Sequence, residues 1–139
     1  MVRRMRAEGE FTVASFVPTG LTPAPASIET GLPPGVAVME KTYTGDVDGR
    51  SATIFTAAFD PDSGVGTYVA MESFEGSLAG RSGTFNFAHS ATTHGPDRAH
   101  EHFVIVPASG TGELAGLTGS GGIDADADHH RIWFEFELG

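Results

Sequence analysis

Residues 76–82 read GSLAGRS, a run in which two glycines enclose one aliphatic residue and a serine follows. The same order recurs at 45–51 (GDVDGRS) and, with threonine in place of serine, at 112–118 (GELAGLT). Glycine adopts positive φ without steric cost and therefore suits tight reversals between strands. The repeat predicts equivalent corners of one antiparallel sheet, each of which tucks its aliphatic residue under the end of a barrel.

Short β-rich runs separated by glycine and proline fill the rest of the chain. The predicted strands are 10–17, 36–44, 50–59, 66–77, 83–93, 101–106, 122–126 and 131–138, with another short strand at 26–30 and one helical turn within 111–117. A new strand every 10–15 residues, with almost no helix, is typical of an all-β sandwich or barrel.

Length and charge bound the remaining possibilities. A chain of 139 residues forms one domain, which we assign to 8–139, with the arginine-rich segment 1–7 as a flexible tail. The absence of cysteine excludes disulfides and thiolate metal sites and agrees with a cytoplasmic location. Eight basic against 18 acidic residues do not supply the basic surface that nucleic acids require, and no apolar run approaches the ~20 residues of a membrane span. We expect neither nucleic acid nor a membrane as a partner.

Strand alternation indicates which side chains face the interior. Phe85, Phe87 and His89 share one face of their strand, and Phe134 and Phe136 share one face of the last strand. These phenylalanines are therefore expected to face inward and to contact any ligand. His89 goes inward with them and is our first candidate for acid–base chemistry, the alternative being a hydrogen-bonded core histidine.

Glu72 is the second candidate, and its orientation is open. It shares a face with Tyr68 and Phe74, whereas Val69 and Met71 compete for the interior. An inward Glu72 would be a carboxylate with a raised pKa in apolar surroundings, and a pair with His89 across adjacent strands would form an acid–base couple. The alternative is a solvated outer glutamate.

Four further side chains enter the site hypothesis. Tyr68 could orient a ligand through its hydroxyl, and Glu40 is a ligand-binding candidate whose orientation is equally open. His100 and His102 have the spacing of two metal ligands on one strand face, but no third ligand can be placed beside them. We therefore predict no metal site and no cofactor.

Two long blocks resemble a family of small bacterial proteins, the domain of unknown function 3224. The first is MESFEGSLAGRSGTF at 71–85 followed by His89 and Ser90, and the second is VPASGTGELAGL at 106–117 followed by two more glycines. The family is similar to allene-oxide-cyclase and dirigent barrels. The resemblance implies an eight-stranded antiparallel barrel with a central cavity, often dimeric, and implies no particular activity.

An eight-stranded barrel has room inside for side chains or for one small ligand. We therefore expect a small apolar molecule in the lumen, with cyclase- or isomerase-type acid–base chemistry. The alternative is a non-catalytic structural or interaction barrel whose core is filled by its own side chains. Because Trp133 and other apolar residues fall on outer faces, we also expect a homodimer.

Overall fold

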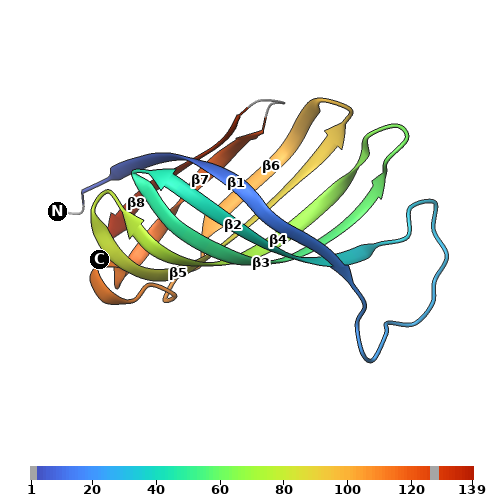
Figure 1. Ribbon diagram of the computed structural model, residues 1–139, viewed down its shortest axis with the longest axis horizontal. Helices are drawn as coiled ribbons and strands as arrows, with labels where there is room; N and C mark the ends of the chain where they lie inside the picture. The colour runs from blue at the N-terminus through green and yellow to red at the C-terminus, as the bar shows by residue number, and fades with distance from the viewer. Residues whose placement is uncertain (1–2, 126–128) are drawn as a thin grey trace.

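The computed structural model describes residues 3–125 and 129–139, which form a closed barrel of antiparallel strands in sequential order (Figure 1). Each strand pairs with the next along the chain, and the last pairs with the first. The elements are β1 (Met5–Thr19), β2 (Gly35–Gly45), β3 (Val47–Asp60), β4 (Val65–Leu78), β5 (Arg81–His94), β6 (Asp97–Ile105), the short 3-10 helix η1 (Gly112–Leu114), β7 (Leu117–Ala125) and β8 (His130–Leu138). The eight-stranded all-β prediction is confirmed.

The structure corrects both ends of the first predicted strand. Met5 and Ala7, expected in a flexible tail, belong to β1 and pair with Phe136 and Phe134 of β8. Ala7 is fully buried, while Arg6 points outward and donates hydrogen bonds of 2.7 Å to Glu8 and to Glu135. Arg4 and Arg6 alternate with the apolar residues Met5 and Ala7, which is the pattern of a strand and not of a flexible tail. Residues 5–10 pair with β8 and thereby close the barrel.

The short strand predicted at 26–30 does not form. These residues lie in an extended loop, 20–34, that projects beyond the barrel between β1 and β2 (Figure 1). Prolines at 23, 25, 33 and 34 flank the run, and proline can neither donate to a ladder nor adopt the usual strand φ.

The glycine repeat closes one end of the barrel, as predicted. Its aliphatic residues Val47, Leu78 and Leu114 are all fully buried in the core. The turn of the second copy places Ala79 at φ 48° and Gly80 at φ 83°, a left-handed pair that joins β4 to β5 directly. The amide of Ala79 donates to the carbonyl of Asp46 at 2.8 Å, which ties the second corner to the first.

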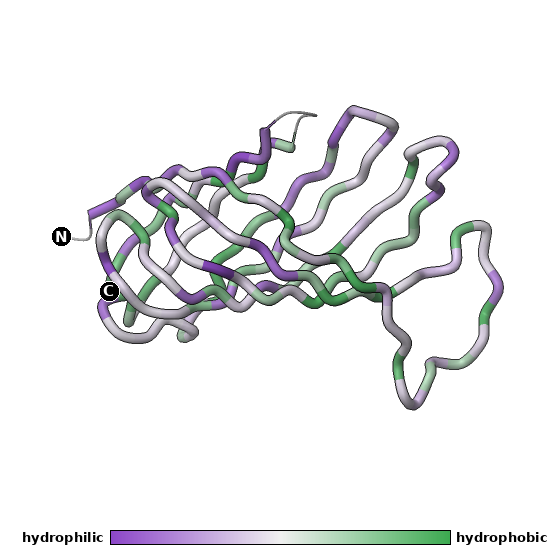
Figure 2. The backbone as a smooth tube through the Cα atoms, viewed as in Figure 1, coloured by the Kyte–Doolittle hydropathy of each residue, from purple (hydrophilic) through white to green (hydrophobic). Residues whose placement is uncertain are grey.

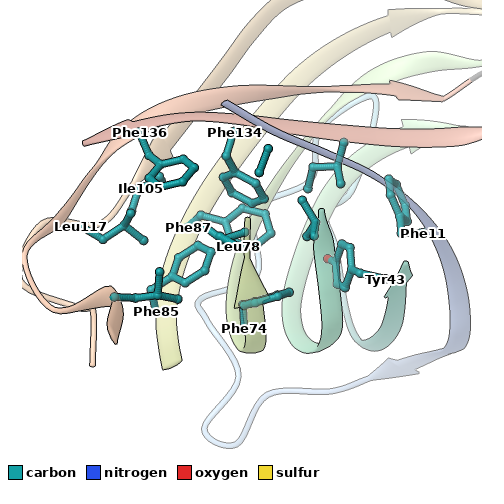
Figure 3. Packing of buried hydrophobic residues seen from close by; sticks show 14 of the residues in the cluster. Phe11, Tyr43, Phe74, Leu78, Phe85, Phe87, Ile105, Leu117, Phe134 and Phe136 are labelled. Carbon is teal, nitrogen blue, oxygen red and sulfur yellow. The ribbon is translucent and has the colours of Figure 1, made fainter. Parts of the chain in front are cut away.

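Aromatic side chains fill the lumen next to this closed end. The rings of Phe85 and Phe87 lie 5.5 Å and 5.2 Å from that of Phe134, and all three point toward one another (Figure 3). Phe136 is also fully buried in this cluster. The inward orientation of the four phenylalanines is confirmed, but they pack on each other and are not arranged around a ligand cavity. Strand alternation reveals which side chains face inward and does not reveal whether they leave space.

The buried corner residues predict a large loss of stability on truncation. Leu78→Ala removes a fully buried side chain from the core, so we expect the free energy of unfolding to fall by about 2–5 kcal/mol. Leu78→Met keeps the volume and should cost less than about 1.5 kcal/mol. Urea unfolding of both variants measures the difference, and equal losses would contradict the role of the Leu78 side chain in filling the closed end.

Candidate functional site

Glu72 lies at the centre of a polar cluster halfway along the barrel. Its side chain projects inward from β4 and is fully buried. Three hydrogen bonds reach the carboxylate from Lys41 Nζ at 2.8 Å, Tyr43 hydroxyl at 2.6 Å and Ser51 hydroxyl at 2.7 Å. A fourth, short contact comes from Nε2 of His89. A buried carboxylate with four donors is a satisfied charge.

Lys41 balances the charge of Glu72. It is the only lysine in the chain, and its side chain points into the barrel and is only 5 % exposed. Its Nζ also lies 4.9 Å from the centre of the Phe11 ring, in cation–π range. Burial of an ion pair is tolerated when the geometry is good and the charges keep their hydrogen bonds, as the carboxylate of Glu72 does here. The hydroxyl of Thr53, the residue opposite Glu72 on β3, is buried without a partner among the described residues.

The donors hold Glu72 in its charged form. Burial acts to raise the pKa of Glu72, but the hydrogen bond from His89 and the charge of Lys41 outweigh it and lower the pKa to about 2. We expected a raised pKa for an inward Glu72, and the structure corrects this because the carboxylate is surrounded by donors. Burial, followed by the charge of Glu72, raises the pKa of Tyr43, so that its hydroxyl remains a donor.

His89 is neutral in this environment. Burial lowers the pKa of His89, and the attraction of Glu72 only partly opposes it. A carboxylate only accepts hydrogen bonds, so Nε2 of His89 carries the proton and Nδ1 is an acceptor. The hydroxyl of Tyr68 lies 2.8 Å from Nδ1 and therefore donates to it.

Arg98 extends the chain of hydrogen bonds to the surface. Its Nη2 donates to the Tyr68 oxygen at 3.0 Å, and its Nε donates to the exposed carboxylate of Glu101 at 2.8 Å. Burial raises the pKa of Tyr68, whereas the hydrogen bond and charge of Arg98 lower it and do not cancel the increase. The tyrosine is thus held between a cation and the acceptor nitrogen of His89.

Tyr68 and Arg98, the outer members of this hydrogen-bond series, lie beside a cleft in the barrel wall. Among the described residues, β6 and β7 share the single pair Val104↔Ser120, whereas β7 pairs with β8 along its whole length. A cavity of about 180 Å³ lies where β6 and β7 separate. Its lining includes Tyr68, His89, Arg98, Glu101, His102, Phe103, Gly121, Gly122 and Trp133. The cleft brings the buried cluster within reach of a small solute.

Tyr68 also borders a second hollow, at the mouth of the barrel opposite the closed end. This hollow has a volume of about 300 Å³ and is lined by Phe16, Phe55, Ala57, Phe59, Gly66, Thr67, Tyr68 and Thr93. The ring of Tyr68 stacks on that of Phe55, with centroids 5.5 Å apart. One aromatic ring therefore separates an apolar hollow from a polar cleft.

The structure joins most of the candidate residues and separates one. Glu72, His89 and Tyr68 are brought together, whereas Glu40 is exposed on the outer face, where it accepts a hydrogen bond from Ser15 at 3.4 Å. Lys41, the next residue, takes the inward position that Glu40 was considered for.

Sequence reasoning missed Lys41 and Arg98. A chain with one lysine, on the same strand face as Ala37 and Tyr43, carried a usable signal for Lys41. No sequence signal pointed to Arg98, because it lies in a segment predicted as a loop. The hairpin of β5 and β6 brings its side chain to Tyr68.

The pair His100 and His102 does not lead to a metal site. Both side chains are exposed, and His100 has φ 53°, which breaks the strand alternation that was assumed for the pair. Within residues 3–125 and 129–139 there is no group of three or more His, Cys, Asp or Glu side chains placed to hold a metal ion. The same residues contain no helix long and apolar enough to cross a bilayer.

The ion pair at the centre of the cluster predicts strong energetic coupling. Lys41→Met leaves a buried carboxylate uncompensated and should cost about 3–5 kcal/mol. In the double variant Lys41→Met/Glu72→Gln neither charge remains, so part of the loss should be regained, with a coupling energy of about 2–3 kcal/mol. Urea unfolding of the four proteins at pH 7 measures this energy, and additive losses would contradict the coupling.

The hydrogen-bond directions predict one tautomer of His89. Nitrogen-detected NMR at pH 7 should show a neutral ring protonated at Nε2, with a pKa below the ordinary 6.5. Because the folded-state pKa is lowered, His89 stabilises the fold above about pH 6.5, and this contribution is lost as the pH falls below that value. A ring protonated at Nδ1, or charged at pH 7, would contradict the arrangement.

Comparison with known proteins supports the predicted family. A model of the family "Protein of unknown function (DUF3224)" matches residues 7–136. A crystal structure of a DUF3224 protein of unknown function from Shewanella oneidensis MR-1 superimposes with a TM-score of 0.83 at 30 % identity, covering 99 % of this chain and 98 % of the other. No curated protein matches. The comparisons do not show the wider likeness to allene-oxide-cyclase and dirigent barrels. The chain belongs to the DUF3224 family.

Proposed function

We propose that this protein binds a small carbonyl compound in the cleft between β6 and β7 and moves a proton on it, as an isomerase does. The observation that carries the proposal is the directed series of hydrogen bonds from Arg98 through Tyr68 and His89 to Glu72. This series leads from the cleft to the buried carboxylate of Glu72, and the donor and the acceptor of each of its hydrogen bonds are identified.

The series has the roles of an acid–base relay. In the resting site burial lowers the pKa of His89 and raises that of Tyr68, so the proton stays on Tyr68. His89 accepts it at Nδ1 only transiently, during the reaction, while Glu72 stabilises the imidazolium that forms, in the way a carboxylate orients and supports a catalytic histidine. Arg98 stabilises the tyrosinate left behind. The tyrosinate takes a proton from the carbon next to a carbonyl and returns it to another atom of the same molecule. His89 then gives its proton back to Tyr68, so atoms and charge balance without a co-reactant.

The size of the cleft limits the substrate. About 180 Å³ is less than the ~300 Å³ of an ordinary ligand pocket, so a small compound or the reactive end of a larger one fits. Phe103 and Trp133 in the lining favour an apolar body attached to the carbonyl. A cysteine-free chain agrees with action in a reducing cytoplasm.

A second candidate function rests on the hollow at the mouth. Its volume of about 300 Å³ reaches the lower end of ordinary ligand pockets, and its walls are mostly aromatic. In this alternative the barrel binds an apolar molecule at its mouth without catalysis, and the polar cluster only holds the strands together. Phe59→Ser would then abolish the rise in melting temperature caused by apolar ligands, and Tyr68→Phe would not.

Proton exchange tests the catalytic proposal directly. The protein is incubated in D2O with a panel of small ketones, enones and β-dicarbonyl compounds, and the loss of the α-proton signal is followed by NMR. We expect faster exchange for at least one compound and a loss of 10²-fold or more in Tyr68→Phe, the range of a positioned acid–base group.

His94→Gln serves as the matched control, because His94 is an exposed histidine at the end of the same strand as His89. It should exchange at the rate of the unaltered protein. Exchange that is unaffected by Tyr68→Phe, or no exchange across the panel, contradicts the catalytic proposal.

A further inference from the structure

The exposed large apolar side chains gather on one side of the barrel. Within the described part of the chain they all fall between residues 13 and 71, on β1 to β4 and the loop between β1 and β2. They are Val13, Phe16, Val17, Leu21, Ile28, Val38, Ile54, Phe59, Val65, Val69 and Met71. Phe16 and Phe59 line the hollow at the mouth of the barrel, so they do not belong to the outer surface. Scattered single residues of this kind need no explanation, but a one-sided set marks an interaction surface.

Four of these residues form a continuous row across the outside of the sheet. Val17 is opposite Val38, Val38 is opposite Ile54, and Ile54 is opposite Met71 on successive strands. Ile54, in the middle, is 66 % exposed. We call Val17, Val38, Ile54 and Met71 the apolar row. Figure 2 shows apolar segments gathered where β1 to β4 run side by side.

The surroundings of the apolar row are almost free of charge. On one side it is flanked by Val36, Thr56 and Val69, and on the other by Ser15, Glu40, Ala52 and Ser73. Glu40 is the one formal charge in these two flanks, although the whole chain has a net charge of −10. Two copies repel each other through most of their surface, so this neutral face is where they can meet at low electrostatic cost.

The loop 20–34 adds a second apolar element beside the apolar row. It starts and ends on the two strands that carry Val17 and Val38, and it projects past the barrel as an arm (Figure 1). Every residue of the arm except Leu32 is exposed, Ile28 to 78 % and Leu21 to 53 %. Its prolines restrict the free chain, which lowers the entropy lost when the arm settles on a partner.

The area of the outer face indicates that a stable interface would need both the apolar row and the arm. Four or five strands about 4.8 Å apart and three residue rows about 6.8 Å apart make a rectangle on the order of 400–500 Å². A standard interface takes roughly 800 Å² from each partner. The face alone falls short, and an arm of 15 residues can supply the remainder. A hollow of about 440 Å³ beside the apolar row offers space for the arm of another copy; its lining includes Glu40, Ala52 and Ser73 near the row and the charged pair Arg50 and Glu75 farther from it.

We propose that two copies of this chain associate face to face through the apolar row, with the arm of each copy lying on its partner. An apolar row without charge pairs has no preferred direction, so it is complementary to itself across a two-fold axis, the usual symmetry of a homodimer. We had expected Trp133 to mark such an interface. Trp133 is instead half-buried on β8, with the guanidinium of Arg6 5.6 Å above its ring.

Sedimentation and light scattering over 1–100 µM test the proposal. The unaltered protein should have twice the 14.5 kDa mass of one chain. Ile54→Lys places a charge in the centre of the apolar row and should yield monomers. Thr118→Lys makes the same change in charge at an exposed position of β7, on another part of the wall, and should remain dimeric.

A double variant tests the arm separately. Leu21→Ser/Ile28→Ser should raise the dimer dissociation constant at least tenfold, with an unchanged circular dichroism spectrum. A monomer at 100 µM overturns the proposal, and so does a dimer that Ile54→Lys leaves intact. A dissociation constant unchanged by the arm variant overturns the part assigned to the arm.

Discussion

The carboxylate of Glu72 is the constraint on which the arrangement of the barrel depends. A fully buried charge is costly unless donors surround it, and here the donors come from β2, β3 and β5 and include the one lysine of the chain. Lys41 on β2, Ser51 on β3 and His89 on β5 must all point inward at the same height. The carboxylate thereby sets the strand register at mid-barrel, since a slip of one residue would turn each donor to the outside.

This polar layer divides the lumen into two unequal parts. Toward the closed end, the buried corner residues of the glycine repeat and the phenylalanine cluster leave a packed core (Figure 3). Toward the mouth, the inward positions hold small residues such as Ala37, Ala70 and Ala91, and space remains between the aromatic rings there. The closed half supplies stability, which allows the open half to keep an apolar hollow and a poorly paired junction between β6 and β7.

The features of the fold and site that could be predicted from the sequence are those that depend on a few neighbouring residues. The strands, the corners and the inward direction of His89 depend on alternation and turn chemistry, which act over a few residues. The packing of Phe85 against Phe134 joins strands far apart in sequence, so alternation could not show that the lumen is filled there. The lowered pKa of Glu72 comes from the hydrogen bond of His89 and from the charge of Lys41, which lies two strands away on β2. Arg98 was missed because a hairpin, and no sequence pattern, brings it to Tyr68.

The two proposed surfaces occupy different parts of the barrel wall and do not compete. The apolar row is centred on β2 and β3, and the cleft lies between β6 and β7, half the circumference away in a ring of eight strands. Association through the row would leave the cleft open to solvent in both copies. It would also cover the outer side of the strands that carry Lys41 and Ser51, so pairing would stiffen the wall that holds Glu72 without touching Tyr68.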